Sequence, residues 1–177
     1  MIKNLFDACI GAIGWFLFGY GFAYGEDAGG FIGGKNFAGS DLEGEENAYY
    51  LEWVFTFTFC ATAATIVSGS LAERTYIETY QIYSAFMSCF IYPIVAHWTW
   101  HSNGWLYTND YIDFAGSGAV HLVGGASGFI GAFILKPRYD YYGTLASGIQ
   151  ELAERRPKIR EIMENDEKLT ELTRPIF

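Results

Sequence analysis

The sequence predicts an all-α membrane protein, a polytopic bundle of four transmembrane helices followed by a short amphipathic helical tail. Of its 177 residues, 51% are hydrophobic, and the charged ones are unevenly distributed. Four apolar stretches, each close to the ~20 residues that cross a hydrocarbon core, contain only Asp7, Glu52 and Glu78 as charged residues. Tyr and Trp gather at the ends of these stretches, as in the aromatic belts of membrane interfaces. The predicted spans are residues 6–24, 50–71, 77–96 and 115–135.

The first span, residues 6–24, contains four glycines. These would weaken a helix in water, but in a membrane small residues let helices approach each other closely. The charged residues of the glycine-rich loop that begins at Gly25 are mostly acidic. We interpret it as a solvated connector, with cation attraction at a pore mouth as the alternative that its charge leaves open.

The second and third spans are bounded by residues that return the chain to water. Glu73 and Arg74 follow the second span directly. The third span contains Pro93, which is expected to kink or end its helix. The aromatic loop after it is rich in turn residues, which suits the membrane interface.

The fourth span, residues 115–135, combines small residues with one ionisable side chain. Gly124, Gly128 and Ala132 recur every four residues, so one face can pack backbone to backbone against another helix. His121 lies in the same stretch, where an ionisable group is costly and marks a functional site by default.

The basic residues predict the orientation of the chain. Most of those close to the spans fall on the side of the membrane that holds both termini, whereas Lys35 alone stands on the other side. The positive-inside bias makes the first side the cytoplasm or an equivalent organellar matrix. The basic residues on that side are Lys3, Arg74, Lys136 and Arg138.

The spans divide the chain into a membrane region, residues 1–136, and a polar tail, residues 137–177. Apolar residues of the tail fall on a helical stripe, so this segment is expected to dock on protein or to lie on the membrane surface.

The composition argues against several functional classes. A net charge of −9 without a basic patch argues against nucleic-acid binding. The three cysteines all lie in apolar stretches and fit neither a disulfide framework nor a thiolate metal site. His97 and His101 stand four residues apart, as a metal-binding pair on a helix would, but the sequence offers no third ligand nearby, so no metal and no cofactor are predicted. The chain has no nucleophile–base pair and no phosphate-binding loop, so it is not predicted to be an enzyme.

Four motifs resemble the ammonium transporter (Amt/Rh) family. The stretch NLFDACIGAIGWFLFGYGFAYG, followed by FIGGKNF, is similar to the second span of that family and the loop after it, and FTFTFCATAATIVSGSLAER is similar to the third span. YPIVAHWTW resembles the end of the fourth span, and DFAGSGAVHLVGGASG the start of the fifth. The resemblance covers about residues 4–138 and implies a partial ammonium-transporter fold.

The resemblance also implies roles for five residues. Phe59 matches an aromatic gate of the family, with Phe55 one turn earlier on the same face. Trp100 matches the Trp that holds ammonium by cation–π attraction, and Asp113 matches a buried acid near that site. His121 matches the first of two pore imidazoles that help the cation deprotonate.

Four of these residues also have a structural interpretation. Phe59 can be an ordinary packing side chain, and Trp100 can anchor the helix in the interfacial belt. Asp113 can cap the first turn of the fourth span, a role that is compatible with the other. His121 can be a satisfied imidazole without a transport role.

The family fold consists of two inverted halves with the conduit between them. This sequence has equivalents of spans two to five and no histidine after His121. We therefore expect a non-conducting accessory or structural subunit of a larger membrane protein complex. Its partners would be other membrane subunits and lipid. The alternative is ammonium or ammonia transport, with ammonium as a ligand, if a second chain completes the pore. The membrane is the plasma membrane by resemblance, or an organellar inner membrane, such as the mitochondrial one, for an assembly subunit.

Overall fold

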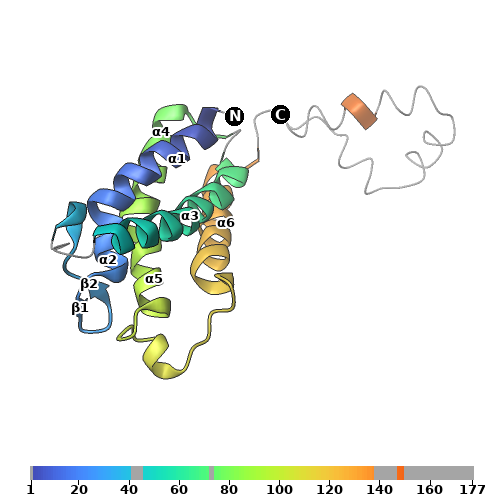
Figure 1. The fold of residues 1–177 in the computed structure, drawn as a ribbon. Helices are drawn as coiled ribbons and strands as arrows, with labels where there is room; N and C mark the ends of the chain where they lie inside the picture. The colour runs from blue at the N-terminus through green and yellow to red at the C-terminus, as the bar shows by residue number, and fades with distance from the viewer. Residues whose placement is uncertain (1, 41–45, 72–73, 138–146, 150–177) are drawn as a thin grey trace. The chain divides into compact units, whose positions relative to one another are not determined.

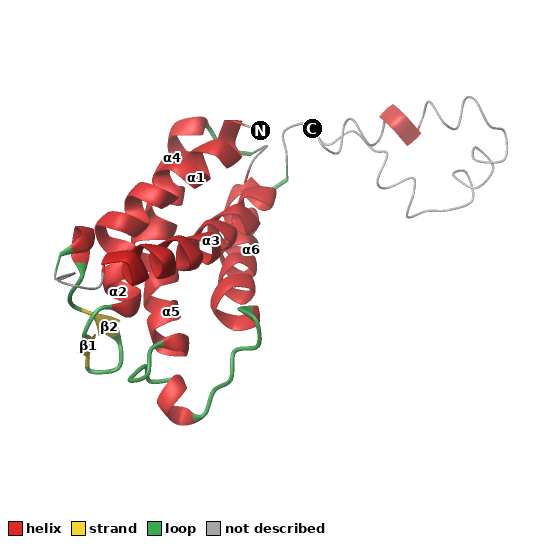
Figure 2. Ribbon diagram, in the orientation of Figure 1, coloured by secondary structure: helices red, strands yellow, loops and turns green. Residues whose placement is uncertain are grey.

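The structure is a computed structural model that describes residues 2–40, 46–71, 74–137 and 147–149. In this part of the chain almost every segment longer than a few residues is helical (Figures 1 and 2). The helices form a bundle, which agrees with the predicted all-α fold class.

The chain divides into two units, Met1–Leu135 and Lys136–Phe177. The first contains all the long helices that the structure describes. The second corresponds to the predicted polar tail, of which only residues 136, 137 and 147–149 are described. The amphipathic helices expected in the tail therefore lie outside the described residues.

Four long helical rods make up the first unit, and three of them include a turn of π-helix. The first rod joins α1 (Ile2–Gly14), a π-turn (Trp15–Gly19) and α2 (Tyr20–Tyr24), and the second is α3 (Glu46–Leu71). The third joins α4 (Ile77–Phe86), a π-turn (Met87–Ile91) and α5 (Tyr92–Trp100). The fourth joins a π-turn (Ser117–Leu122) to α6 (Val123–Leu135).

Pro93 was expected to kink or end the third rod, and the expectation that it ends the helix is wrong. The helix continues to Trp100, and Pro93 occupies the first turn of α5 directly after the π-turn Met87–Ile91. Because proline cannot donate to the helical ladder, a local change from α to π hydrogen bonding just before it removes part of the conflict.

Among the described residues, three helices are long and apolar enough to cross a membrane: Lys3–Tyr24, Tyr49–Leu71 and Ser117–Leu135. They correspond to the first, second and fourth predicted spans. The rod from Ile77 to Trp100 has the length but is less apolar, because it carries Glu78, Gln81 and several tyrosines. Its passage through the bilayer stays a prediction.

The loop after α2 is more ordered than a plain connector. It forms a small antiparallel hairpin of β1 (Asp27–Ala28) and β2 (Ile32–Gly33). Gly30 has a positive φ of 78°, a conformation that glycine adopts without strain, and its N–H donates to Asp27 Oδ1 over 2.6 Å. This turn fixes the Asp27 carboxylate beside the end of the helical bundle.

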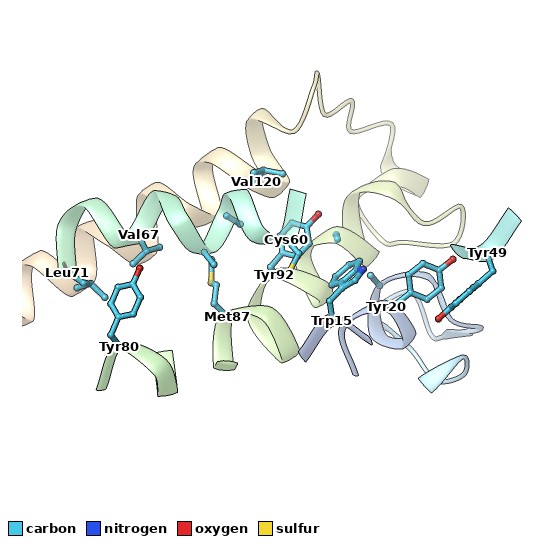
Figure 3. Close-up of a cluster of buried hydrophobic side chains, with 14 residues drawn as sticks. Trp15, Tyr20, Tyr49, Cys60, Val67, Leu71, Tyr80, Met87, Tyr92 and Val120 are labelled. Atoms are coloured by element: carbon cyan, nitrogen blue, oxygen red, sulfur yellow. The ribbon is translucent and has the colours of Figure 1, made fainter. Parts of the chain in front are cut away.

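The core lies between the rods, and its largest buried side chains are aromatic (Figure 3). Trp15, Tyr80 and Tyr92 are fully buried, and the rings of Trp15 and Tyr92 lie 5.6 Å apart. The first and third rods touch backbone to backbone: a Cβ on Gly19 would stand 2.6 Å from the carbonyl oxygen of Ser88. Glycine is therefore required at this crossing, as the small-residue pattern of the first span predicts.

Candidate functional site

A recess of about 310 Å³ opens where four segments of the first unit meet. Its walls come from α3, from the C-terminal ends of α2 and α5, and from the turn that precedes the last rod. Phe55, Phe59, Trp100 and Asp113 all line it, so four of the five residues singled out in the sequence are brought together. The remaining lining residues are Tyr24, Thr56, Ala115 and Gly116.

Three aromatic rings form one wall of the recess. Phe55 and Phe59 are one turn apart on α3, and their rings meet edge to face with centroids 5.0 Å apart. Phe59 in turn meets Trp100 at 5.6 Å, again in a T-shaped arrangement. Edge-to-face contacts of this kind contribute about 0.5–1.5 kcal/mol beyond burial and fix the ring planes. The wall therefore presents defined aromatic surfaces, the kind of surface that attracts a cation.

Asp113 supplies the negative charge of the recess and also caps the last rod. Its Oδ1 accepts the Gly118 N–H at 2.7 Å and the Ser117 hydroxyl at 3.1 Å, and its Oδ2 accepts the Ala119 N–H at 3.1 Å. The residue at the cap position itself is Gly116, which has a φ of 79°. Asp113 thus caps from three residues earlier than a standard N-cap, which lets its carboxylate border the recess as well.

His121 is the one predicted pore residue that does not line the recess. It lies in the π-turn Ser117–Leu122, its N–H donates to the Gly116 carbonyl at 3.0 Å, and its side chain is exposed. One turn further along, a Cβ on Gly125 would meet no atom within 4 Å. An ionisable side chain thus stands on a face of an apolar helix that no other described residue covers, although such residues normally face a protein interior or a water-filled cavity.

The opposite face of α6 packs on α3. Gly124 and Gly128 are buried there: a Cβ on Gly124 would lie 2.8 Å from the Ile66 Cβ, and one on Gly128 would lie 3.0 Å from the Ser70 hydroxyl. Ala132, the third residue of the predicted series, is half-buried.

A second polar group lies at the end of the bundle where the recess opens. His97 is fully buried, with Nδ1 2.9 Å from the Ala23 carbonyl and Nε2 3.0 Å from Asp27 Oδ1. The His101 ring stacks on the His97 ring with centroids 4.3 Å apart. The hydrogen bond from His97 lowers the pKa of Asp27, and burial lowers the pKa of His101. The sequence-based premise that no third ligand is near the two histidines is therefore wrong, because Asp27 lies beside them.

Sequence reasoning also missed the environment of Asp7. The sequence marks it only as a charge in the first span, whereas the structure buries it completely, with the Tyr80 hydroxyl donating to Oδ2. Tyr24 and Thr56, which line the recess, were not singled out either. Thr56 follows Phe55 directly, but nothing in the local pattern marks a threonine of an apolar helix as part of a site.

A sequence profile described as the Ammonium Transporter Family matches residues 1–152. The chain belongs to the ammonium transporter family. Among similar proteins, "Ammonium transporter 1 member 3" of Oryza sativa subsp. japonica is 46% identical over 148 residues, which is 78% of this chain and 30% of the relative. "Ammonium transporter 1 member 3" of Solanum lycopersicum is 43% identical over 154 residues, 81% of this chain and 33% of the relative.

Solved structures give the same family. The chain superposes on a structure titled "Sensor Amt Protein" with a TM-score of 0.75 and 36% identity, over 80% of this chain and 36% of that one. It superposes on Mep2 of Candida albicans with a TM-score of 0.69 and 28% identity, over 76% and 31% of the two chains. The chain thus spans about a third of the length of the relatives it matches. It is an integral, multi-pass membrane protein of this family.

Proposed function

We propose that this chain forms one wall of a membrane path for ammonium or ammonia, and that a further polypeptide segment covers its open side. The observation that carries the proposal is the convergence of Phe55, Phe59, Trp100 and Asp113 on one recess of about 310 Å³. Aromatic faces beside a carboxylate attract a small cation through both the ring quadrupole and the charge. The names of the relatives, which are ammonium transporters, support ammonium as that cation.

In this proposal Trp100 and Phe59 hold the cation in the recess, and Asp113 keeps the local potential negative. His121 lies beyond the recess on the last rod, the one that Asp113 caps. An imidazole there can accept a proton from ammonium as it passes. The uncovered side of His121 and the space beside Gly125 support the need for a covering segment. The described residues do not enclose a path at His121.

A second candidate function is a non-conducting structural or accessory subunit of a larger membrane assembly. The same uncovered face favours it, because a wall without a facing partner supports packing as readily as conduction. Both candidates place the chain among other membrane subunits and lipid. We propose the plasma membrane as its location, with both ends of the helical bundle, Ile2 and Leu135, on the cytoplasmic side, as the basic residues indicate.

Ammonium-induced current distinguishes the two candidates. The chain, purified by a tag together with its natural partners, is reconstituted in proteoliposomes, and currents after ammonium concentration jumps are compared with those of Trp100→Leu. Desolvated cation–π contacts contribute about 2 kcal/mol, so the half-saturating ammonium concentration should rise roughly 30-fold.

The matched control is Trp105→Leu, because Trp105 is an exposed tryptophan outside the recess. It should leave the half-saturating concentration unchanged. Equal effects of the two substitutions would contradict the role of the recess. Neutral ammonia carries no current but raises the internal pH, so an intact assembly that gives neither a current nor a faster rise in internal pH than protein-free liposomes would support the structural subunit instead.

A further inference from the structure

We propose that Asp27, His97 and His101 form a binding site for a divalent transition-metal ion such as Zn²⁺. The three side chains each offer one ligand atom, and these atoms lie within 4.8 Å of one another. They come from the β1 turn and from the end of α5, so the ion would join two segments about 70 residues apart. Nothing in the proposed ammonium path requires this site, and the two proposals stand independently.

The hydrogen bonds of His97 define the position that the ion would occupy. The Ala23 carbonyl can only accept, so Nδ1 of His97 carries the proton and donates over 2.9 Å. The Nε2 atom is then left facing a carboxylate oxygen, Asp27 Oδ1, at 3.0 Å. Two acceptors cannot hold such a contact by themselves. Either a proton lies between them, on a charged imidazole, or a metal ion takes the place of that proton.

Histidine ligands of metal ions are commonly oriented by a hydrogen bond from the ring nitrogen that does not bind the metal. Their second ring nitrogen usually donates to a carbonyl or carboxylate, which fixes the tautomer and aims the free nitrogen at the metal. In this chain the Ala23 carbonyl has that role. His97 is fully buried, so its ring has little freedom to leave this orientation.

The distances permit coordination after a small movement. Zn–N and Zn–O bonds of about 2.0–2.2 Å at a tetrahedral centre place ligand atoms roughly 3.3 Å apart. The His97–Asp27 pair already meets this spacing at 3.0 Å. His101 has to move its nitrogen inward by up to about 1.5 Å, which a side-chain rotation of a half-buried residue provides. Water would complete the coordination, since three protein ligands leave one position open.

The donor set selects among cations. Two imidazoles and one carboxylate suit Zn²⁺, Cu²⁺ or Ni²⁺, whereas Ca²⁺ and Mg²⁺ prefer oxygen ligands alone. Burial lowers the pKa of His101, which favours the neutral ring that a metal ion requires, and the ion would replace the hydrogen bond of 3.2 Å that Nδ1 accepts from the Asn103 N–H. A bound ion would hold the hairpin against the end of α5, because its ligand His101 directly follows Trp100 in the sequence.

Calorimetric titration of the full chain in nanodiscs, after removal of metal with a chelator, tests the site with Zn²⁺ as the probe. We expect one ion per chain, bound at least tenfold more weakly by His101→Ala and by Asp27→Asn. His101 is the preferred histidine to change, because replacing the buried His97 can unfold the chain. The bound ion should also raise the Tm of the wild type and not that of His101→Ala.

Matched controls are available for both substitutions. His121→Ala removes the other histidine of the sequence. Asp110→Asn changes an exposed acid; its backbone is left-handed, a conformation that asparagine tolerates. Both should bind Zn²⁺ as the wild type does.

Several results would overturn the site. These are a wild type that binds no more tightly than His101→Ala, controls that weaken binding equally, and Ca²⁺ or Mg²⁺ displacing Zn²⁺. A thiolate charge-transfer band in the Co²⁺-loaded protein would assign the ion to cysteines instead.

Discussion

The contact between α3 and α6 gives a sharp test of the packing. A Cβ added at Gly124 would stand 2.8 Å from the Ile66 Cβ and 3.0 Å from the Ala63 carbonyl oxygen. Carbon atoms in contact prefer about 3.5–4.0 Å, so alanine at position 124 forces the two helices apart by roughly 0.7 Å or distorts them. The carbonyl cannot rotate away as a side chain would, because it belongs to the α3 backbone.

Two opposing effects set the size of the change. Overpacking a well-fitted contact costs about 1–3 kcal/mol. Replacing glycine by alanine inside a helix stabilises the helix by up to about 1 kcal/mol. A single measurement on Gly124→Ala mixes these two effects, so a matched substitution is needed to separate them.

Gly125→Ala is that matched substitution. It makes the same chemical change in the same helix, but its Cβ would meet no atom within 4 Å. Subtracting its free energy of unfolding from that of Gly124→Ala therefore leaves the overpacking cost. We expect Gly124→Ala to be less stable than Gly125→Ala by about 1–3 kcal/mol, measured by reversible unfolding in mixed micelles followed by circular dichroism. Equal stabilities, or a more stable Gly124→Ala, would refute the close approach of α3 and α6.

Two other substitutions have defined outcomes. Asp113→Asn should destabilise the chain by about 1 kcal/mol, because an amide can accept the Gly118 N–H but its NH₂ group cannot accept the Ala119 N–H. Chemical unfolding measures this change in stability, and an unchanged midpoint would argue against the cap. Tyr80→Phe keeps the ring that Lys3 contacts and removes only the hydroxyl that bonds Asp7. The substitution should lower the free energy of unfolding by about 1–3 kcal/mol, because a buried carboxyl loses its partner, and the Tm should fall with it. An unchanged Tm would mean that this hydrogen bond contributes nothing to stability.

The helices could be predicted from the sequence because each apolar stretch is long and nearly free of charge. The rods begin and end within four residues of the predicted spans; the largest differences are the starts at Ile2 and Glu46 and the end at Trp100. The π-turns could not be predicted, because their sequences read as ordinary helix. The hairpin turn depends on a hydrogen bond between Asp27 and Gly30, which composition alone does not reveal.

The site could be predicted only in part, for a physical reason. Phe59 and Trp100 lie 41 positions apart in the sequence, and no local pattern requires their rings to meet; only the family resemblance connected them. The same resemblance said nothing of Asp27, which reaches His97 across 70 positions. Long-range side-chain contacts follow from how the rods cross, and single-sequence periodicity carries no information about the crossing.

The most direct test of the proposed path is what lies against His121 in the native assembly. His121→Cys, in a chain whose three cysteines are replaced by serine, can be labelled in native membranes with a small hydrophilic thiol reagent. Phe133→Cys on the exposed, apolar end of α6 serves as the lipid-facing reference. A wetted path predicts fast labelling at position 121, slowed by ammonium, and little at position 133, since only a hydrated thiol ionises and reacts. Equally slow labelling at both positions would contradict the path and leave His121 facing lipid or packed protein.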